Sequence, residues 1–217
     1  MLHVPSPSHP RPPDGHYFTE EPGVASRPSA VRLDLPDLSL RLATDRGVFS
    51  GTRVDPGTKL LLQELPAVPS WPAGPAVDVG CGYGPIAVTV AVRDPGREVW
   101  AVDVNGRARD LCRANAVAAG VAGRVRVAAP EEVPDDLRVG LVVSNPPVRV
   151  GKEVLQDLLR HWLGRLTDDG EAWLVVQKHL GADSLARWLR DDLGHDVERV
   201  RSRQGYRILR VGRPPAT

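Results

Sequence analysis

Three glycines at positions 80, 82 and 84 follow an aspartate, Asp78, and are flanked by two apolar runs. The run before them is short, as in a strand, and the run after them starts behind Pro85, which suits the first turn of a helix. A strand, a glycine turn and a helix N-terminus together let a backbone approach a polar ligand closely. A dinucleotide fingerprint would have its third glycine one residue later, and a carboxylate before the turn would repel a pyrophosphate. The stretch therefore favours a ligand with a positive group, such as the ammonium of an amino acid.

A second acidic residue, Asp103, ends a predicted strand nineteen residues after Gly84. In a doubly wound sheet this position lies beside the glycine turn, where a carboxylate can accept both hydroxyls of a ribose. The alternative is a strand-end aspartate that caps the next helix. The Asp-x-Gly-x-Gly-x-Gly pattern resembles motif I of class I S-adenosylmethionine (SAM) dependent methyltransferases. The resemblance implies SAM as the cofactor, with contacts to Asp78, Gly80, Cys81, Gly82, Gly84, Asp103, Val104 and Asn145.

Asn145, Pro146 and Pro147 follow an almost wholly apolar predicted strand and are the predicted catalytic residues. An amine conjugated to a base ring is a poor nucleophile, because its lone pair is delocalised. The side-chain oxygen of Asn145 and the carbonyl of Pro146 can accept its two hydrogens and aim the lone pair at a sulfonium methyl. The prolines hold both acceptors rigid, and no strong base is needed because the proton leaves late. The alternative is a proline-stiffened turn without chemistry.

Longer stretches make the resemblance specific to one family. They are Gly47-Val48-Phe49-Ser50, Asp55-Pro56-Gly57-Thr58-Lys59-Leu60-Leu61-Leu62, Asp103-Val104-Asn105-Gly106-Arg107-Ala108, and Asn145-Pro146-Pro147 with Gly151-Lys152. From about residue 17 to 212 the chain resembles the ribosomal RNA guanine-N2 methyltransferases of the methyltransferase small domain group. The resemblance implies a class I fold, Asn145 at the acceptor amine, and a loop around Phe49 and Thr58 that covers the cofactor.

The chain departs from that family in its aromatic and acidic positions. An aromatic residue usually follows Asn-Pro-Pro, but here the residue is Val148. Base stacking, worth about 1–3 kcal/mol, would then need Phe49, Tyr83 or Tyr206. The predicted third strand lacks the acidic residue that often binds adenine, which leaves backbone groups, apolar walls or Glu131.

The predicted substrate-binding residues are Val148, Arg149, Lys152 and Arg203, with Arg201 and Arg207 as further cations for RNA phosphates. Ordinary solvated surface charge is the alternative interpretation of these cations. The formal net charge is only +1, so a nucleic acid would be met by a local patch. Two cysteines and the absence of a signal segment or membrane-length apolar run favour the cytoplasm. No spacing of ligands predicts a metal site.

Alternating strands and helices predict an α/β fold: a Rossmann-like, doubly wound, mostly parallel seven-stranded sheet with helices on both faces. After the strand that leads to the glycine turn, strands are expected at 98–103, 124–128, 139–144 and 172–176. Strands at 197–200 and 206–211, joined by residues 201–205, should form an antiparallel C-terminal hairpin. Helices are expected after Asp55-Pro56, after Pro85, and over 107–119, 154–166 and 185–193.

The predicted organisation has three parts. Residues 1–16 form a disordered proline-rich tail, residues 17–66 an extension, and residues 67–213 the SAM-dependent methyltransferase domain. The extension contains a small β-hairpin (29–35 and 38–43), the cofactor-covering loop and a helix. The oligomeric state stays open.

The leading hypothesis is methyl transfer from SAM to an exocyclic amine, guanine N2 of ribosomal RNA, with ribosomal RNA or a ribosomal subunit as the partner. The alternatives are adenine N6, a glutamine side-chain amide in a protein, and a non-catalytic SAM-binding or RNA-binding protein. Val148 favours neither adenine nor glutamine, and an intact Asn145 argues against lost catalysis.

Overall fold

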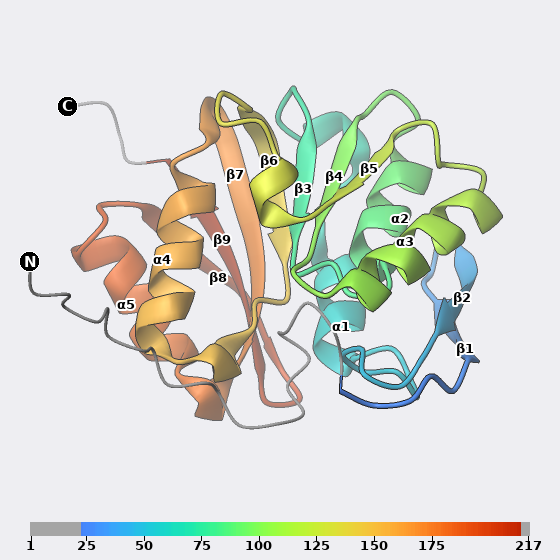
Figure 1. The fold of residues 1–217 in the computed structure, drawn as a ribbon. Helices are drawn as coiled ribbons and strands as arrows, with labels where there is room; N and C mark the ends of the chain where they lie inside the picture. Colours follow the sequence, from blue (N-terminus) through green and yellow to red (C-terminus); the bar gives the residue numbers. More distant parts are fainter. Residues whose placement is uncertain (1–22, 214–217) are drawn as a thin grey trace, which may run out of the picture.

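The computed structural model describes residues 23–213 (Figure 1). The predicted tail over residues 1–16 lies outside the described residues, as do residues 17–22 of the predicted extension. The described chain contains a seven-stranded sheet in the order β5-β4-β3-β6-β7-β9-β8 and a two-stranded sheet, β1-β2. This confirms the predicted mostly parallel sheet with an antiparallel C-terminal hairpin and a small N-terminal hairpin.

The parallel centre of the sheet decides where the predicted site residues meet. Its strands are β3 (Ala76–Val79), β4 (Val99–Val102), β5 (Val125–Ala128), β6 (Val139–Ser144) and the longer β7 (Leu166–Gln177). β3 pairs in parallel with both β4 and β6. The glycine turn after β3, Asp103 after β4 and Asn145 after β6 therefore leave the same edge of the sheet on neighbouring strands.

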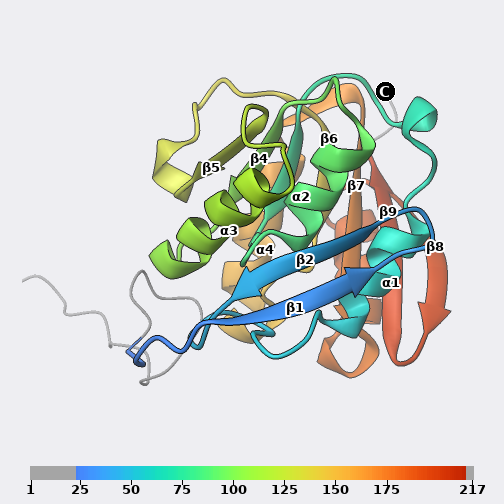
Figure 2. The same ribbon diagram turned by 90° about the vertical axis from the view of Figure 1, so that its right-hand side faces the viewer.

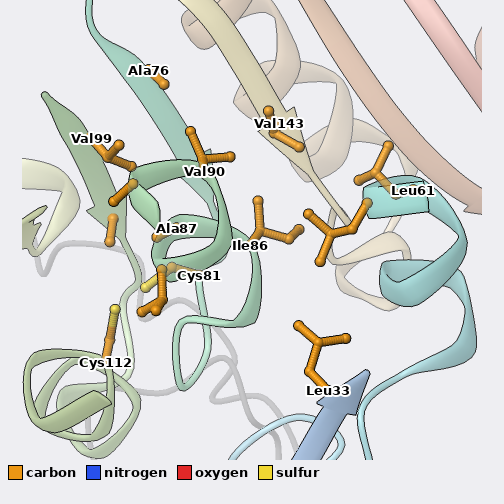
Figure 3. Close-up of a cluster of buried hydrophobic side chains, with 14 of the residues drawn as sticks. Leu33, Leu61, Ala76, Cys81, Ile86, Ala87, Val90, Val99, Cys112 and Val143 are labelled. Carbon is orange, nitrogen blue, oxygen red and sulfur yellow. The ribbon is translucent and has the colours of Figure 1, made fainter. Parts of the chain in front are cut away.

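Within residues 23–213, five α-helices cover the two faces of this sheet. They are α1 (Pro56–Glu64), α2 (Pro85–Arg93), α3 (Gly106–Ala118), α4 (Lys152–Leu163) and α5 (Ala182–Asp191). The first three bury their apolar sides in one core, part of which Figure 3 shows, while α4 and α5 pack into a second core on the opposite face. The predicted start of α1 is confirmed, because the Asp55 carboxylate accepts the Thr58 backbone N–H at 3.0 Å.

The N-terminal hairpin consists of β1 (Ser29–Asp34) and β2 (Ser39–Thr44) and lies outside α2, as Figure 2 shows. Its Leu33 and Leu42 are buried in the first core. The Asn115 side chain on α3 ties the hairpin down, since it donates to the Ala43 carbonyl at 2.9 Å and accepts the Ala43 N–H at 2.7 Å. The loop that follows β2 therefore starts from a fixed point. The division into an extension (17–66) and a methyltransferase domain (67–213) stays a prediction.

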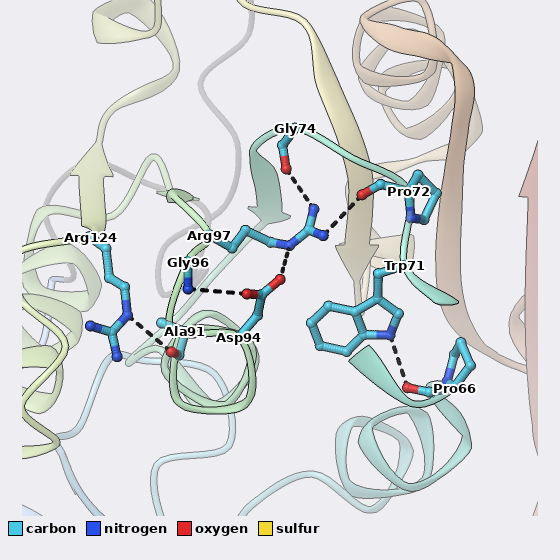
Figure 4. Close-up of polar contacts among 9 residues, drawn as sticks. All are labelled: Pro66, Trp71, Pro72, Gly74, Ala91, Asp94, Gly96, Arg97 and Arg124. Carbon is cyan, nitrogen blue, oxygen red and sulfur yellow. Dashed lines mark hydrogen bonds and ion pairs between the residues drawn. The ribbon is translucent and has the colours of Figure 1, made fainter. Parts of the chain in front are cut away.

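The proline-rich connector between α1 and β3 is held by one arginine (Figure 4). The Arg97 guanidinium donates to the Gly74 carbonyl at 2.6 Å and the Pro72 carbonyl at 2.9 Å, and it pairs with Asp94 at 2.8 Å. It also lies 5.6 Å from the ring centroid of Trp71. These bonds satisfy connector carbonyls that have no strand or helix partner, so β3 enters the sheet in a defined position.

Predicted boundaries were wrong at the end of α4, at the start of β7, which was expected at residue 172, and at the C-terminal strands. Leu166 fits the helical spacing of α4, but α4 ends at Leu163 and Leu166 begins β7, where its side chain still reaches the second core. The C-terminal strands are also longer than predicted: β8 (Asp196–Arg203) and β9 (Tyr206–Gly212) leave a turn of only Gln204 and Gly205. Both turn residues have positive φ, 51° and 80°, as a tight type I′ hairpin turn requires.

No helix within residues 23–213 combines the length and the apolar character needed to span a membrane.

Candidate active site

A cavity of about 440 Å³ opens at the carboxyl edge of the sheet. Its glycine-loop side is lined by Gly80, Gly82, Asp103, Val104, Asn105 and Pro130, and its β7 side by Val148, Arg149, Trp162, Gln177, Leu180 and Tyr206. Because β6 lies between β3 and β7, the loop of Asn145, Pro146 and Pro147, which also lines the cavity, separates the two sides. The volume is typical of a small-molecule site, at about 300–1,000 Å³.

The glycine loop presents open backbone to this cavity. Gly82 has a φ of 56°, and a Cβ there would meet no atom within 4 Å. Gly84 serves a different purpose and does not line the cavity: its φ is 91°, and a Cβ there would lie 2.7 Å from the Cys112 sulfur. Gly82 therefore leaves room for a ligand, whereas Gly84 lets the loop pack against α3.

Asp103 lies where the sequence places it, in the lining of the glycine-loop side. One of its oxygens accepts the Gly82 N–H at 2.8 Å and the other accepts the Asn105 N–H at 2.9 Å. Asn105 rather than Asp103 caps α3, which leaves the remaining lone pairs of Asp103 for a ligand. Burial raises the pKa of Asp103, although the N–H groups of Asn105 and Gly82 and the nearby Arg109 oppose this rise. Ribose binding stays a prediction.

Asp78 is almost fully buried and does not line the cavity. One carboxyl oxygen accepts the Ala87 N–H at 2.9 Å, which ties β3 to the start of α2. The other oxygen has no hydrogen-bond partner within the described residues. Burial raises the pKa of Asp78 to about 8, with a smaller contribution from the charge of Asp103.

Replacing Asp78 by asparagine is expected to change how stability depends on pH. The folded protein keeps the Asp78 proton up to a pKa of about 8, whereas an unfolded chain releases it near pH 4. Between these values the folded state binds more protons, so this residue's contribution to the unfolding free energy falls as pH rises. Urea titrations should show that the unfolding free energy of wild type, relative to that of Asp78→Asn, falls by roughly 1–4 kcal/mol between pH 5 and pH 8. Parallel pH profiles for the two proteins would contradict this.

Asn145 is held by helix α1. Its amide nitrogen donates to Asp55 Oδ1 at 2.9 Å and to Thr58 Oγ1 at 3.0 Å. Because the nitrogen is turned toward α1, the amide oxygen is left for the cavity that Asn145 lines. The Pro146 carbonyl accepts the Val148 N–H at 2.8 Å around Pro147, whose φ of −75° and ψ of 71° form an inverse γ-turn. That carbonyl keeps one lone pair for a second donor.

Two of the three candidate stacking rings reach the cavity. Phe49 is 45% exposed and lines it, and Tyr206 lines its β7 side. Tyr83 is only 2% exposed, so it offers no face for a base; it borders a small recess with Cys81, Thr58 and Phe49. Trp162, which lies within the helix predicted over 154–166, also lines the cavity and was not among the predicted site residues.

The predicted cations lie at different distances from the cavity. Arg149 lines it, and so does Arg53, which sequence reasoning missed. Lys152 at the start of α4 and Arg203 at the end of β8 are exposed and do not line it. Arg201 pairs with Glu64 at 2.8 Å and Arg207 with Asp183 at 3.5 Å, which weakens both as phosphate ligands.

Neither acidic residue directly after β5, Glu131 or Glu132, lines the cavity. Glu131 is exposed and does not line the cavity, whereas its neighbour Pro130 does. The Glu132 carboxylate accepts the Ala129 N–H at 2.6 Å and so caps the short turn. This leaves apolar walls and backbone groups for a planar base.

Known proteins similar to this chain identify its family. The model of the methyltransferase small domain matches residues 39–210. The chain belongs to the methyltransferase small domain family. This confirms the predicted family and the class I methyltransferase fold, and it makes the protein a methyltransferase that uses SAM as its cofactor.

The relatives differ in length. The chain is 34% identical over 201 residues to "Uncharacterized protein YbxB" of Bacillus subtilis (strain 168), covering 90% of this chain and 97% of that protein. It is 34% identical over 195 residues to ribosomal RNA small subunit methyltransferase C of Pseudomonas entomophila (strain L48), covering 85% of this chain and 55% of that protein. Ribosomal RNA large subunit methyltransferase G of Streptomyces avermitilis is 33% identical over 187 residues, covering 76% and 46%. The chain thus spans about half the length of these two named methyltransferases.

A solved structure shares the fold. The T. thermophilus 16S rRNA N2 G1207 methyltransferase (RsmC), in complex with AdoMet and guanosine, superimposes with a TM-score of 0.75 at 23% sequence identity. The match covers 88% of this chain and 52% of that one.

Proposed function

We propose that the protein transfers the methyl group of SAM to an exocyclic amine, the N2 amine of guanine in ribosomal RNA. The observation that carries this proposal is the orientation of Asn145, whose amide nitrogen is bonded to α1 and whose oxygen is left for the cavity. An amide oxygen at this edge is an acceptor for an amine that must lose its ring conjugation. The ribosomal RNA methyltransferases among the relatives support the choice of substrate.

The glycine-loop side of the cavity fits the cofactor. The Asp103 carboxylate can accept two ribose hydroxyls, and the open backbone at Gly82 can approach the ligand without a side chain in the way. Val104 and Pro130 offer apolar surface for the adenine, and Phe49 and Ser50 of the loop after β2 also line the cavity. When bound, SAM supplies an electrophilic methyl group on a positively charged sulfur.

The acceptor amine would be held by Asn145 and Pro146. Their two oxygens accept its hydrogens, which draws the nitrogen toward tetrahedral geometry and directs its lone pair along the line of transfer. The proton is released after the new bond forms, so water can take it and the chain needs no general base. Phe49 and Tyr206 are the rings that can contact the base in place of the aromatic residue absent at Val148.

The experiment is methyl transfer from labelled SAM to ribosomal RNA taken from cells that lack the protein, followed by nucleoside analysis. We expect label in N2-methylguanosine. If the label instead appears in N6-methyladenosine or in a protein glutamine, that group is the acceptor and guanine is not. No transfer by the wild-type protein would overturn the catalytic proposal in favour of a binding protein.

Two arginines at the cavity give a further prediction about RNA binding. Within the described residues neither Arg53 nor Arg149 has an ion-pair partner, and both line the cavity. If each arginine contacts a phosphate, Arg53→Ser or Arg149→Ser should make the slope of log K against log salt concentration shallower by about 0.7–0.9 per lost contact. The matched control is Arg41→Ser, because Arg41 is exposed on β2 and does not line the cavity.

The check is the slope of log K against log salt concentration, measured by fluorescence anisotropy with labelled RNA. Unchanged slopes for both cavity variants would assign the phosphate contacts elsewhere. In that case the exposed Lys152 and Arg203 are the next residues to replace.

A further inference from the structure

Asp55 caps helix α1, whose first residues are Pro56-Gly57-Thr58. The side chains of Asp55 and Thr58 meet Asn145, although they lie 90 and 87 residues away in sequence. Asp55 Oδ1 accepts two hydrogens, one from the Thr58 backbone at 3.0 Å and one from the Asn145 amide at 2.9 Å. Thr58 Oγ1 accepts the other amide contact at 3.0 Å. Both Asp55 and Thr58 are buried, so water does not compete freely for these bonds.

This arrangement selects one orientation of the Asn145 amide. An ionised carboxylate accepts hydrogen bonds but cannot donate one. Turning the amide over would set its oxygen against Asp55 Oδ1, so that two acceptors face each other and the bond to Asn145 is lost, which is costly. The Asn145 nitrogen is therefore kept on α1, and its oxygen is kept for the cavity.

Gly57 and Tyr206 extend the same arrangement to the C-terminal hairpin. A Cβ at Gly57 would lie 2.4 Å from the Tyr206 ring, so only glycine lets the ring come this close. The Tyr206 hydroxyl accepts from Gln177 Nε2 at 3.2 Å and makes a long contact of 3.4 Å with Asp55 Oδ2. The start of α1 is thus fixed against β9 and, through the Tyr206 hydroxyl, linked to Gln177 at the end of β7. Both Tyr206 and Gln177 line the β7 side of the cavity.

We propose that Asp55 and Thr58 are positioning residues for methyl transfer: they hold the Asn145 nitrogen so that its oxygen meets the acceptor amine. The inference rests on the proposed function, in which Asn145 contacts that amine. It explains the residue types in the segment. Asp55 caps the helix and orients Asn145, Gly57 admits the Tyr206 ring, and Thr58 supplies the second acceptor.

Two pairs of variants separate positioning from folding. Asp55→Ser keeps a good helix cap but is too short to reach Asn145, whereas Asp55→Asn keeps both the cap and an acceptor oxygen. Thr58→Val removes the hydroxyl at nearly constant shape, and Thr58→Ser retains it. We expect Asp55→Ser and Thr58→Val to lower kcat by about 10–100-fold. Asp55→Asn and Thr58→Ser should each recover at least about tenfold of that loss. KM and the SAM dissociation constant should change little.

The Asn145 side-chain amide provides a readout that does not depend on turnover. In nuclear magnetic resonance spectra of protein labelled with ¹⁵N, its two hydrogens should be slowed in exchange with water in wild type and exchange faster in Asp55→Ser and Thr58→Val. Wild-type kcat and unchanged exchange in both variants would overturn the proposal. So would a fall in kcat that matches an equal fall in SAM affinity or in unfolding free energy, because that is a structural effect.

The outcomes also distinguish this inference from the proposed function. If wild type methylates adenine or glutamine instead of guanine, the substrate is wrong but the same variant comparison applies to the new acceptor. If wild type transfers no methyl group to RNA or protein, both proposals fail.

Discussion

Replacing Asn145 by alanine is expected to lower kcat for methyl transfer by about 10²–10³-fold, the usual effect of removing one preorganised hydrogen-bonding group that acts in the transition state. The amide oxygen of Asn145 is the acceptor that α1 leaves for the cavity, so its loss removes the group that redirects the amine lone pair. The SAM dissociation constant should change far less than kcat. Single-turnover transfer from labelled SAM, together with calorimetric titration of the cofactor, measures both.

Gln63→Ala is the matched control, because Gln63 carries an exposed amide on α1 and does not line the cavity. Asn145→Asp is a sharper test, since it keeps an oxygen at this position but places a second carboxylate beside Asp55. It should therefore be impaired as well. A kcat for Asn145→Ala close to that of wild type would remove Asn145 from the mechanism.

Asp103→Ala is expected to raise the dissociation constant of SAM by about 10²–10⁴-fold, because a hydrogen bond to a charged group contributes a net of roughly 1.5–3 kcal/mol and two are lost. Its carboxylate also fixes the Gly82 and Asn105 N–H groups, so the glycine loop should become less ordered. Asp110→Ala is the control, because Asp110 is exposed on α3 and pairs only with Arg113 among the ion pairs of the described chain.

A cofactor analogue without the ribose 2′-hydroxyl tests the cause of this loss. It should bind wild type more weakly than SAM does, and the difference should shrink in Asp103→Ala. If the variant instead discriminates between the two ligands as strongly as wild type, Asp103 acts on the loop and not on the ribose.

The sequence predicts the sheet edge well because the relevant signals are local. Three local patterns each identify one part of the cavity lining. They are a strand followed by glycines, an aspartate at the end of a second strand, and Asn-Pro-Pro after an apolar strand. Because parallel strands end at the same edge of a sheet, these three segments must lie close together. The fold and the positions of Asp103 and Asn145 at the cavity follow from these patterns.

The parts that sequence reasoning missed depend on contacts between distant segments. No local signal says that Asp55 will meet Asn145, or that the Tyr206 ring will pack on Gly57. Trp162 has the spacing of a core residue, and it is both buried and part of the cavity lining. Helical spacing also extended the predicted helix beyond the true end of α4. Leu166 has that spacing, but it reaches the second core from strand β7.

Some residues of the glycine motif also serve the protein's own structure. Asp78 and Gly84 were predicted to contact the cofactor, but neither lines the cavity, and direct contact by either stays a prediction. In the structure Asp78 bonds to the start of α2 and Gly84 makes room for Cys112. A motif read from sequence thus combines groups that meet a ligand with groups that shape the loop.

The place of β9 in the sheet has a consequence for how the enzyme is made. β9 lies between β7 and β8, and it carries the Tyr206 ring that lines the cavity. On a translating ribosome β9 emerges after every other described strand, so until then β7 has an unpaired edge, which invites aggregation. Nascent chains that stop short of β9 should therefore be inactive and need chaperones, and activity should appear only once β9 has been made.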